Sequence, residues 1–206
     1  MTEKQIEEIR TKIRSNRARL RAEQKKYGAC RDGEGKRYYI AELYAKIGDF
    51  RGALRYFHWF EEEFPQDIGD PLFHFIWTVA LVENNRTEEA KKKAYTTAFS
   101  NTYLFDLLMD RRVEQMDKSE LISFESLEFA EEIKETCIKY GTERFFSWLK
   151  SFTESEEYRD NMNAFINLSK QIKHTEQGEE RRALLKQERD FINSLTLNRQ
   201  TEVIDV

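Results

Sequence analysis

The stretch at residues 28–39 contains the residue types from which phosphate-binding loops are built. It reads GACRDGEGKRYY and holds three glycines and a Gly-Lys pair. A nucleotide-binding P-loop places four residues between its first glycine and the Gly-Lys, and then a Ser or Thr that binds magnesium. In this chain six residues separate Gly28 from Gly35, and Arg37 stands at the hydroxyl position. We therefore interpret the stretch as a turn that connects two helices.

Histidine and carboxylate side chains offer a second kind of chemistry, the binding of a metal ion. His58, Glu61 and Glu62 have the spacing of one helix face, and His74 follows in the next predicted helix. Zinc hydrolases often present two histidines on one helix with a glutamate as base. That arrangement is not found around His58, so we expect its glutamates to face water. We predict no metal ion, no cofactor and no catalytic residue.

The chain contains two cysteines, Cys30 and Cys137, which lie far apart in the sequence. Two isolated thiols do not make a disulfide framework, and neither cysteine has a histidine base near it in the sequence. Cys137 lies on the apolar side of its predicted helix, so we expect it in the core, whereas Cys30 falls in a polar turn. The N-terminus is charged from its third residue, and no apolar run approaches the roughly 20 residues that cross a bilayer. These features predict a reduced, cytoplasmic protein without membrane contact.

Positive charge is concentrated near the N-terminus. Residues 10–26 contain eight Lys or Arg and a single acidic residue, Glu23, whereas the whole chain has 34 basic and 38 acidic residues. This is the best signal in the sequence for nucleic acid or an acidic partner. However, the predicted helix opens with three glutamates, and the basic stretch at residues 10–26 contains no aromatic residue for base stacking. We interpret the cluster as a solvated helix face and do not expect a nucleic-acid partner.

The elements that carry these residues are predicted to be helices throughout. Hydrophobic residues make up 39% of the chain, charged residues 35% and aromatic residues 13%, with only two prolines and eight glycines. This composition is typical of a helix-rich folded protein, and no stretch shows the alternation of a strand. We predict an all-α fold with helices over residues 3–27, 38–47, 51–64, 72–82, 87–99, 155–173 and 179–197.

A regular spacing of small and aromatic residues suggests a repeated helical hairpin. Small residues let two antiparallel helices approach, aromatic residues fill the space between them, Gly permits the turn and Pro ends the second helix. A shift of 37 residues places Gly48 on Asn85 and Ala53 on Ala90, which gives a second and weaker unit. In the first unit the spaced positions are Ala41, Tyr44, Gly48, Ala53, Phe57, Phe60 and Pro65.

This pattern resembles the tetratricopeptide repeat, a helical hairpin of about 34 residues that stacks into a superhelix. The resemblance covers about residues 34–104, and its strongest part is YYIAELYAKIGDFRGALRYFHWFEEEFP. Phe60 replaces the usual alanine of the family, and Arg37 stands where the family has an early tryptophan.

The resemblance implies a tetratricopeptide-like superhelix of antiparallel helical hairpins, preceded by a long helix and followed by a further hairpin. Phe145, Phe146, Trp148, Leu149 and Phe152 are expected to cover the end of the stack, because an unpaired repeat exposes an apolar face. The expected divisions are an N-terminal helix and turn (1–30), two hairpins (31–104), a degenerate third repeat with capping helices (105–153), a C-terminal hairpin (154–197) and a disordered tail (198–206).

In this family the first helix of each hairpin lines a concave face that holds a peptide or a partner helix. Some members clamp a terminal carboxylate with Lys and Asn, but Tyr38 and Glu42 stand at those positions here. Aromatic residues of the face could instead anchor an apolar side chain, and burial of the face by the N-terminal helix or the C-terminal hairpin is an equal alternative. The partner-binding residues implied are Tyr38, Glu42, Lys46, Phe75, Val79 and Glu83.

The sequence therefore favours a non-catalytic interaction module, an adaptor or scaffold whose short groove holds a protein or peptide partner. The first alternative is a structural protein that forms homo-oligomers through its long terminal helices. An enzyme with a site assembled from distant residues is the remaining alternative, because helical repeats can host one.

Overall fold

The computed structural model describes residues 1–28, 30, 32–65 and 67–197, and every regular element in this part of the chain is helical. The fold is all-α, as predicted, and the seven helices expected from the sequence are confirmed to within two residues at each end. The elements are α1 (Glu3–Tyr27), α2 (Lys36–Lys46), α3 (Phe50–Glu63), α4 (Pro71–Glu83), α5 (Thr87–Ser100), α6 (Leu104–Leu108), the 3-10 helix η1 (Ser123–Glu125), α7 (Leu127–Tyr140), α8 (Glu143–Thr153), α9 (Glu156–His174) and α10 (Glu179–Thr196). None of the helices in the described residues is long and apolar enough to cross a membrane.

Local capping interactions explain where the helices begin and end. Thr2 and Gln5 form a reciprocal capping box at the start of α1, and the side chains of Asp49 and Asp70 accept hydrogen bonds from the first amides of α3 and α4. Such caps satisfy backbone N–H groups that have no partner within the helix. Gly28 ends α1 with φ of 71°, a left-handed conformation that costs other residues energy. The helix ends are thus determined by interactions between residues a few positions apart in the chain.

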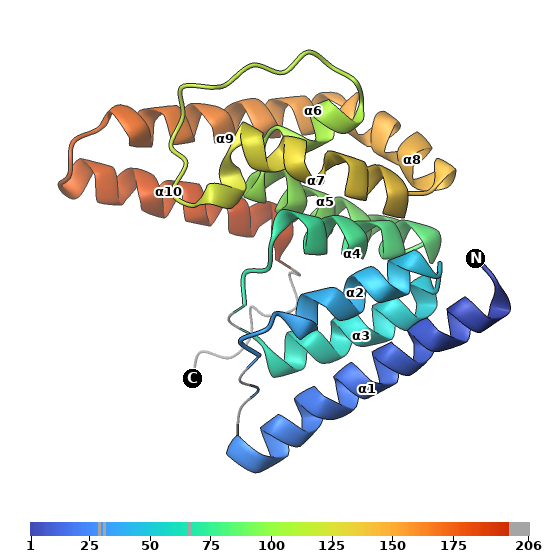
Figure 1. Ribbon diagram of the computed structural model, residues 1–206. Coiled ribbons are helices and arrows are strands. Elements are labelled where there is room, and N and C mark those ends of the chain that lie inside the picture. The colour runs from blue at the N-terminus through green and yellow to red at the C-terminus, as the bar shows by residue number, and fades with distance from the viewer. Residues whose placement is uncertain (29, 31, 66, 198–206) are drawn as a thin grey trace.

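The helices form consecutive layers that meet at α4 (Figure 1). On one side α4 contacts α2 and α3, and α1 packs on α2 at the outer end of that layer. On the other side α4 contacts α5, α7 and α8, while α10 returns along α5 and pairs with α9. Because neighbours surround α4, its residues Phe73 through Val82 are all buried. A helix that is apolar all round is stable only in such a central position.

Aromatic side chains fill the space between α3 and α4. The rings of Phe57 and Trp77 are stacked with their centroids 4.5 Å apart. Phe60, which departs from the repeat pattern, packs its ring 4.6 Å from that of Phe73. Ala41 and Ala53 are fully buried, in agreement with their expected role as small residues at the helix contact. Cys137 lies in the core as predicted, and burial raises the pKa of its thiol.

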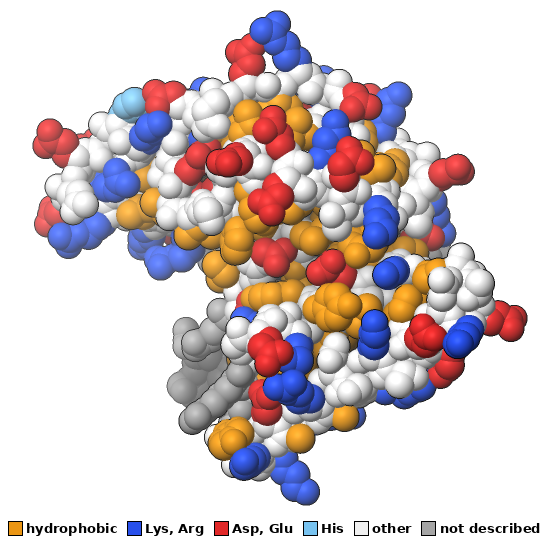
Figure 2. All heavy atoms as spheres, in the orientation of Figure 1, with side chains coloured by type: hydrophobic (Ala, Val, Ile, Leu, Met, Phe, Trp, Pro, Cys, Tyr) orange, Lys and Arg blue, Asp and Glu red, His pale blue; other side chains and the backbone are white. Residues whose placement is uncertain are grey.

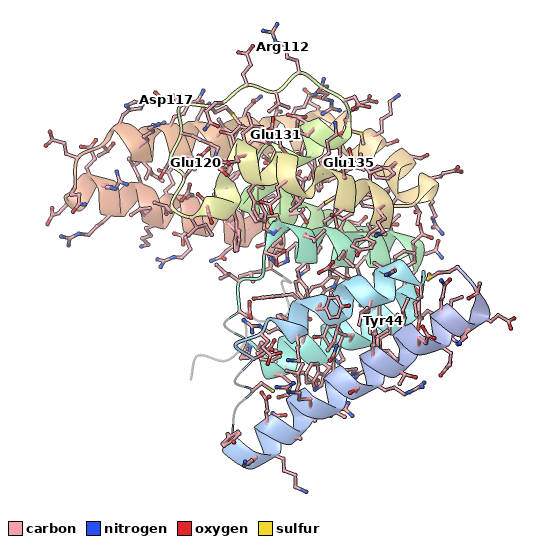
Figure 3. The ribbon with its side chains drawn as sticks, in the orientation of Figure 1. Tyr44, Arg112, Asp117, Glu120, Glu131 and Glu135 are labelled. Carbon is pink, nitrogen blue, oxygen red and sulfur yellow. The ribbon has the colours of Figure 1, made fainter. Side chains whose placement is uncertain are left out.

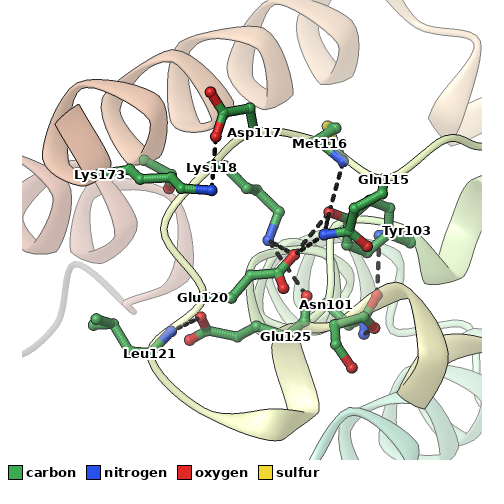
Figure 4. A network of polar contacts seen from close by, with 12 residues as sticks. Asn101, Tyr103, Gln115, Met116, Asp117, Lys118, Glu120, Leu121, Glu125 and Lys173 are labelled. Carbon is green, nitrogen blue, oxygen red and sulfur yellow. Dashed lines mark hydrogen bonds and ion pairs between the residues drawn. The ribbon is translucent and has the colours of Figure 1, made fainter.

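Residues 105–153 contain the short helix α6, a long connection and the pair α7 and α8. The connection is held by buried polar contacts around Tyr103 (Figure 4). The Tyr103 hydroxyl donates to Glu120 Oε1 at 2.8 Å and accepts from the backbone N–H of Met116 at 3.1 Å. Lys118 is only 5% exposed and pairs with Glu120 at 3.1 Å. These partners satisfy one another, so the network fixes the path of the connection and leaves its charged groups compensated.

The C-terminal hairpin consists of α9 and α10. One face of α9 is buried, and the large apolar residues of α10 are half-buried against α5 and α9. The tail predicted for residues 198–206 lies outside the described residues. The buried residues of α9 are Tyr158, Met162, Phe165, Leu168, Ser169 and Ile172.

Candidate functional site

The N-terminus of α2, where a phosphate would lie in a nucleotide-binding loop, is occupied by a carboxylate of the same chain. Asp32 accepts hydrogen bonds from the backbone N–H groups of Lys36 at 2.9 Å and Arg37 at 2.7 Å. The guanidinium of Arg37 in turn donates from Nε to Asp67 at 2.6 Å. Asp32 thus takes the favourable position for an anion at this helix end. The interpretation of the glycine-rich stretch as a joint between α1 and α2 is confirmed.

The two apolar residues predicted to bind a partner, Phe75 and Val79, have no exposed surface. The ring of Phe75 contacts that of Phe145 on α8 at 5.0 Å, and α4 as a whole packs against α7 and α8. Glu83, at the end of the same helix, accepts a hydrogen bond from the Thr142 hydroxyl at 2.5 Å. This face of α4 is therefore covered by α7 and α8, in the middle of the chain.

The three predicted residues on α2 lie beside this covered face. Tyr38 is half-buried, and its hydroxyl donates to Asp67 Oδ1 at 2.5 Å. Glu42 is half-buried, accepts a hydrogen bond from the Tyr140 hydroxyl at 3.2 Å, and has a pKa raised by burial. Lys46 is exposed. Of the six predicted residues only Lys46 is exposed, and the others are buried or half-buried within the chain.

His58, His74 and Cys30 differ in their exposure to solvent. His58 is 78% exposed and lies 3.5 Å from Glu62, whereas His74 is buried in α4. Cys30, which the sequence places in a polar turn, is half-buried, and its thiol donates to the Leu20 carbonyl at 3.2 Å. Within the described ranges, no three His, Cys, Asp or Glu side chains gather as metal ligands would.

A groove of about 590 Å³ lies between α5, α8, the start of α9 and the end of α10. Its aromatic lining consists of Tyr95, Trp148 and Phe152. The rings of Trp148 and Phe152 are stacked at 5.2 Å, and Tyr95 meets Phe152 edge-on at 5.3 Å. The remaining lining residues are Glu88, Lys91, Lys92, Ser151, Ser155, Glu157, Ser194, Leu195 and Leu197.

The polar residues of this groove stand at its rim and largely pair with one another. Lys91 lies 3.1 Å from Glu88, and Lys92 Nζ donates to the Leu197 carbonyl at 3.2 Å. The Tyr95 hydroxyl accepts from Asn161 Nδ2 at 2.9 Å, and burial raises the pKa of this tyrosine. Tyr95 and Phe152 are 4% and 8% exposed, so the half-buried Trp148 supplies most of the accessible aromatic surface of this groove. Ligand sites that combine aromatic side chains with a few polar groups enclose about 300 to 1,000 Å³.

The sequence contained part of the signal for this groove. Trp148 and Phe152 were recognised as an apolar helix face and were expected to cover the stack. Phe145, on the same helix, is fully buried and its ring contacts that of Phe75. Tyr95 and the end of α10 are distant in sequence from α8, so only tertiary packing brings them to the same place.

Comparisons of the chain with protein-family models, with curated proteins and with solved structures give no match.

Proposed function

We propose that the protein is a non-catalytic helical adaptor, and that a protein or peptide partner binds in the groove between α5, α8 and α10. The observation that carries this proposal is the groove of about 590 Å³ with its floor of Tyr95, Trp148 and Phe152. The resemblance of the α2–α3 and α4–α5 hairpins to tetratricopeptide repeats supports it, because proteins of that architecture present grooves to extended partners. In this proposal the groove lies along α5, away from the covered face of α2 and α4.

The groove fits a partner segment with one or two large apolar side chains. Aromatic surfaces recognise such anchors, and burial of an aromatic side chain is a frequent source of binding energy. The hydroxyls of Ser151 and Ser194 donate to carbonyls of their own helices, so at the rim they offer acceptor oxygens to N–H groups of a partner. We therefore expect specificity for an apolar anchor in an extended or helical peptide.

Self-assembly through the N-terminal helix has less support. Ile9, Ile13 and Leu20 are the buried residues of α1, and they already pack within the chain. The guanidinium of Arg17 lies over the rings of Tyr56 and Trp59 at 5.8 and 5.9 Å. The apolar seam that a helix pair would need is thus used inside one molecule.

A peptide-display selection followed by affinity measurement tests the adaptor proposal. We expect the wild-type protein to select peptides that share a large apolar residue. The double variant Ser151→Arg, Ser194→Arg should weaken their binding about tenfold or more, because two long side chains then enter the groove from its exposed rim. The matched control Ser15→Arg, on the exposed side of α1, should bind normally. A selection without a consensus, or equal binding by the groove variant, would contradict the proposal.

A further inference from the structure

The outer face of α7 carries an uncompensated acidic surface. Glu128, Glu131, Glu132 and Glu135 are all exposed, and no ion pair to any of them is formed by the residues that the structure describes. Of the two lysines on this helix, Lys134 pairs with Asp110 at 3.3 Å and Lys139 lies over the Tyr140 ring at 5.6 Å. Acidic side chains gather in this region of the surface, with apolar groups between them (Figure 2).

Large apolar side chains are exposed at both ends of this acidic face. Before α7, Leu121 is 63% exposed, Ile122 44% and Phe124 36%. Near its C-terminal end, Ile138 is 43% exposed and Tyr39 of α2 is 45% exposed. Soluble proteins expose single apolar side chains routinely, but a concentration of them around one helix is typical of an interaction site.

The apolar and acidic residues share one surface for reasons that the structure shows. The ring of Phe124 contacts that of Phe129 in the first turn of α7 at 4.9 Å, so the apolar connection is tied to this helix. Glu128, Glu131, Glu135 and Ile138 follow one another at steps of three and four residues, the spacing of one helix face. Glu131 and Glu135 are labelled on α7 in Figure 3.

Carboxylates at this spacing repel one another, and a cationic partner would relieve that repulsion. The apolar residues at each end require an apolar counterpart, and α7 is 14 residues long, or about 21 Å. These requirements are met together by a helix of about four turns that presents Lys or Arg beside Leu, Ile or Phe. We propose that the face formed by residues 121–124, the outer side of α7 and Tyr39 binds a cationic amphipathic helix of a partner protein.

The chain itself contains a cationic helix, and its structure favours another protein as the occupant. In α1 the basic residues other than Arg17 face solvent, but Ile9, Ile13 and Leu20 are buried in the same molecule. The α1 of a second copy would therefore bring charge without the apolar side chains that Phe124 and Ile138 require. The proposed face is also distinct from the aromatic groove, so one molecule could hold two partners at once.

Fluorescence anisotropy with designed peptides tests the proposal. The probe is a labelled amphipathic helix of Leu and Lys, compared with a scrambled peptide of the same composition and with a Leu and Glu version. We expect the amphipathic Leu and Lys peptide to bind best, and its affinity to fall with ionic strength. Equal binding of the scrambled peptide, or no binding of the probe, would overturn the proposal.

Charge-reversal variants assign the binding to α7. The double variant Glu131→Lys, Glu135→Lys should lower the affinity for the probe about tenfold, and Ile138→Ser should lower it several-fold. The control Asp160→Lys with Asp190→Lys changes the net charge equally at exposed sites on α9 and α10 and should bind nearly as the wild type does. An equal loss of probe affinity in the control would show that net charge alone attracts the peptide, and it would refute a local site on α7.

Two further measurements separate this face from the other occupants. Sedimentation of the protein alone should give a monomer, and a dimer abolished by the α7 variant would show that a second copy occupies the face. The groove variant Ser151→Arg, Ser194→Arg should keep its affinity for the probe, and a loss there would place the binding in the groove and refute the assignment to α7.

Discussion

Acidification should destabilise the fold through one buried histidine, His74. Its Nε2 lies 2.6 Å from the Ile68 carbonyl, and since a carbonyl only accepts, Nε2 carries the proton and donates. Its Nδ1 is buried and has no hydrogen-bond partner in the described part of the chain. Burial, with repulsion from Lys93, lowers the pKa of His74 from 6.5 to about 4. A second proton would put a charge into a site that offers it no acceptor.

The direction and size of the effect follow from proton linkage. As the pH falls below 6.5, the unfolded chain binds a proton that the folded chain does not accept until about pH 4. The free energy of unfolding therefore decreases through this range and the loss is complete below it. At about 1.4 kcal/mol per pKa unit, the full loss is about 3 kcal/mol. This is a large part of the 5–15 kcal/mol that is typical of a folded domain.

Urea denaturation of the wild type and of His74→Gln, from about pH 7 to about pH 4, measures this contribution. The variant lacks the titrating group, so its stability relative to the wild type should improve by about 3 kcal/mol as the pH falls. His58→Gln, a change at a histidine that is 78% exposed, should keep the wild-type profile. Titration of His74 near its ordinary pKa by NMR, or an equal loss of stability in both proteins, would contradict this prediction.

Two stability predictions concern the joint before α2 and the covered face of α4. Asp32→Ala removes the acceptor for two amides of α2 and a partner of Arg37. Thermal unfolding should therefore show that the free energy of unfolding falls by about 1 to 3 kcal/mol. The control Asp160→Ala, at an exposed position, should change this free energy little. Phe75→Ala should lower the free energy of unfolding, measured by urea denaturation, by about 3 to 5 kcal/mol, because the side chain is fully buried against Phe145. Phe124→Ala should lower it far less, because Phe124 is exposed. A small loss in Phe75→Ala would mean that α8 does not cover this face.

The two binding predictions complement these stability tests, because each uses substitutions at exposed positions. Variants at Ser151 and Ser194 report on the groove, and variants at Glu131 and Glu135 report on the face of α7. If both predictions hold, the chain is an adaptor with two separate binding surfaces. If one fails, the other is unaffected, since the two surfaces share no residue.

The sequence alone determined seven of the ten α-helices in the described residues, and their ends. Gly28 and Gly48 adopt the left-handed conformation at turns that glycine predicted, and the seven expected helices lie where the apolar spacing placed them. These features depend on interactions between residues a few positions apart, namely caps, turns and helical periodicity. Such interactions are encoded in short stretches and can be read from them.

The tertiary structure alone decided which apolar faces are covered. Phe75 and Val79 have the same pattern whether they line an open groove or a core, and contact with α7 and α8 buries them. Trp148 packs against the core and, with Tyr95 and the end of α10, also lines a groove. An apolar residue gains similar free energy from any apolar neighbour, so the pattern predicts burial without naming the partner. The choice among partners depends on the packing of segments far apart in the chain, which the spacing of residues does not record.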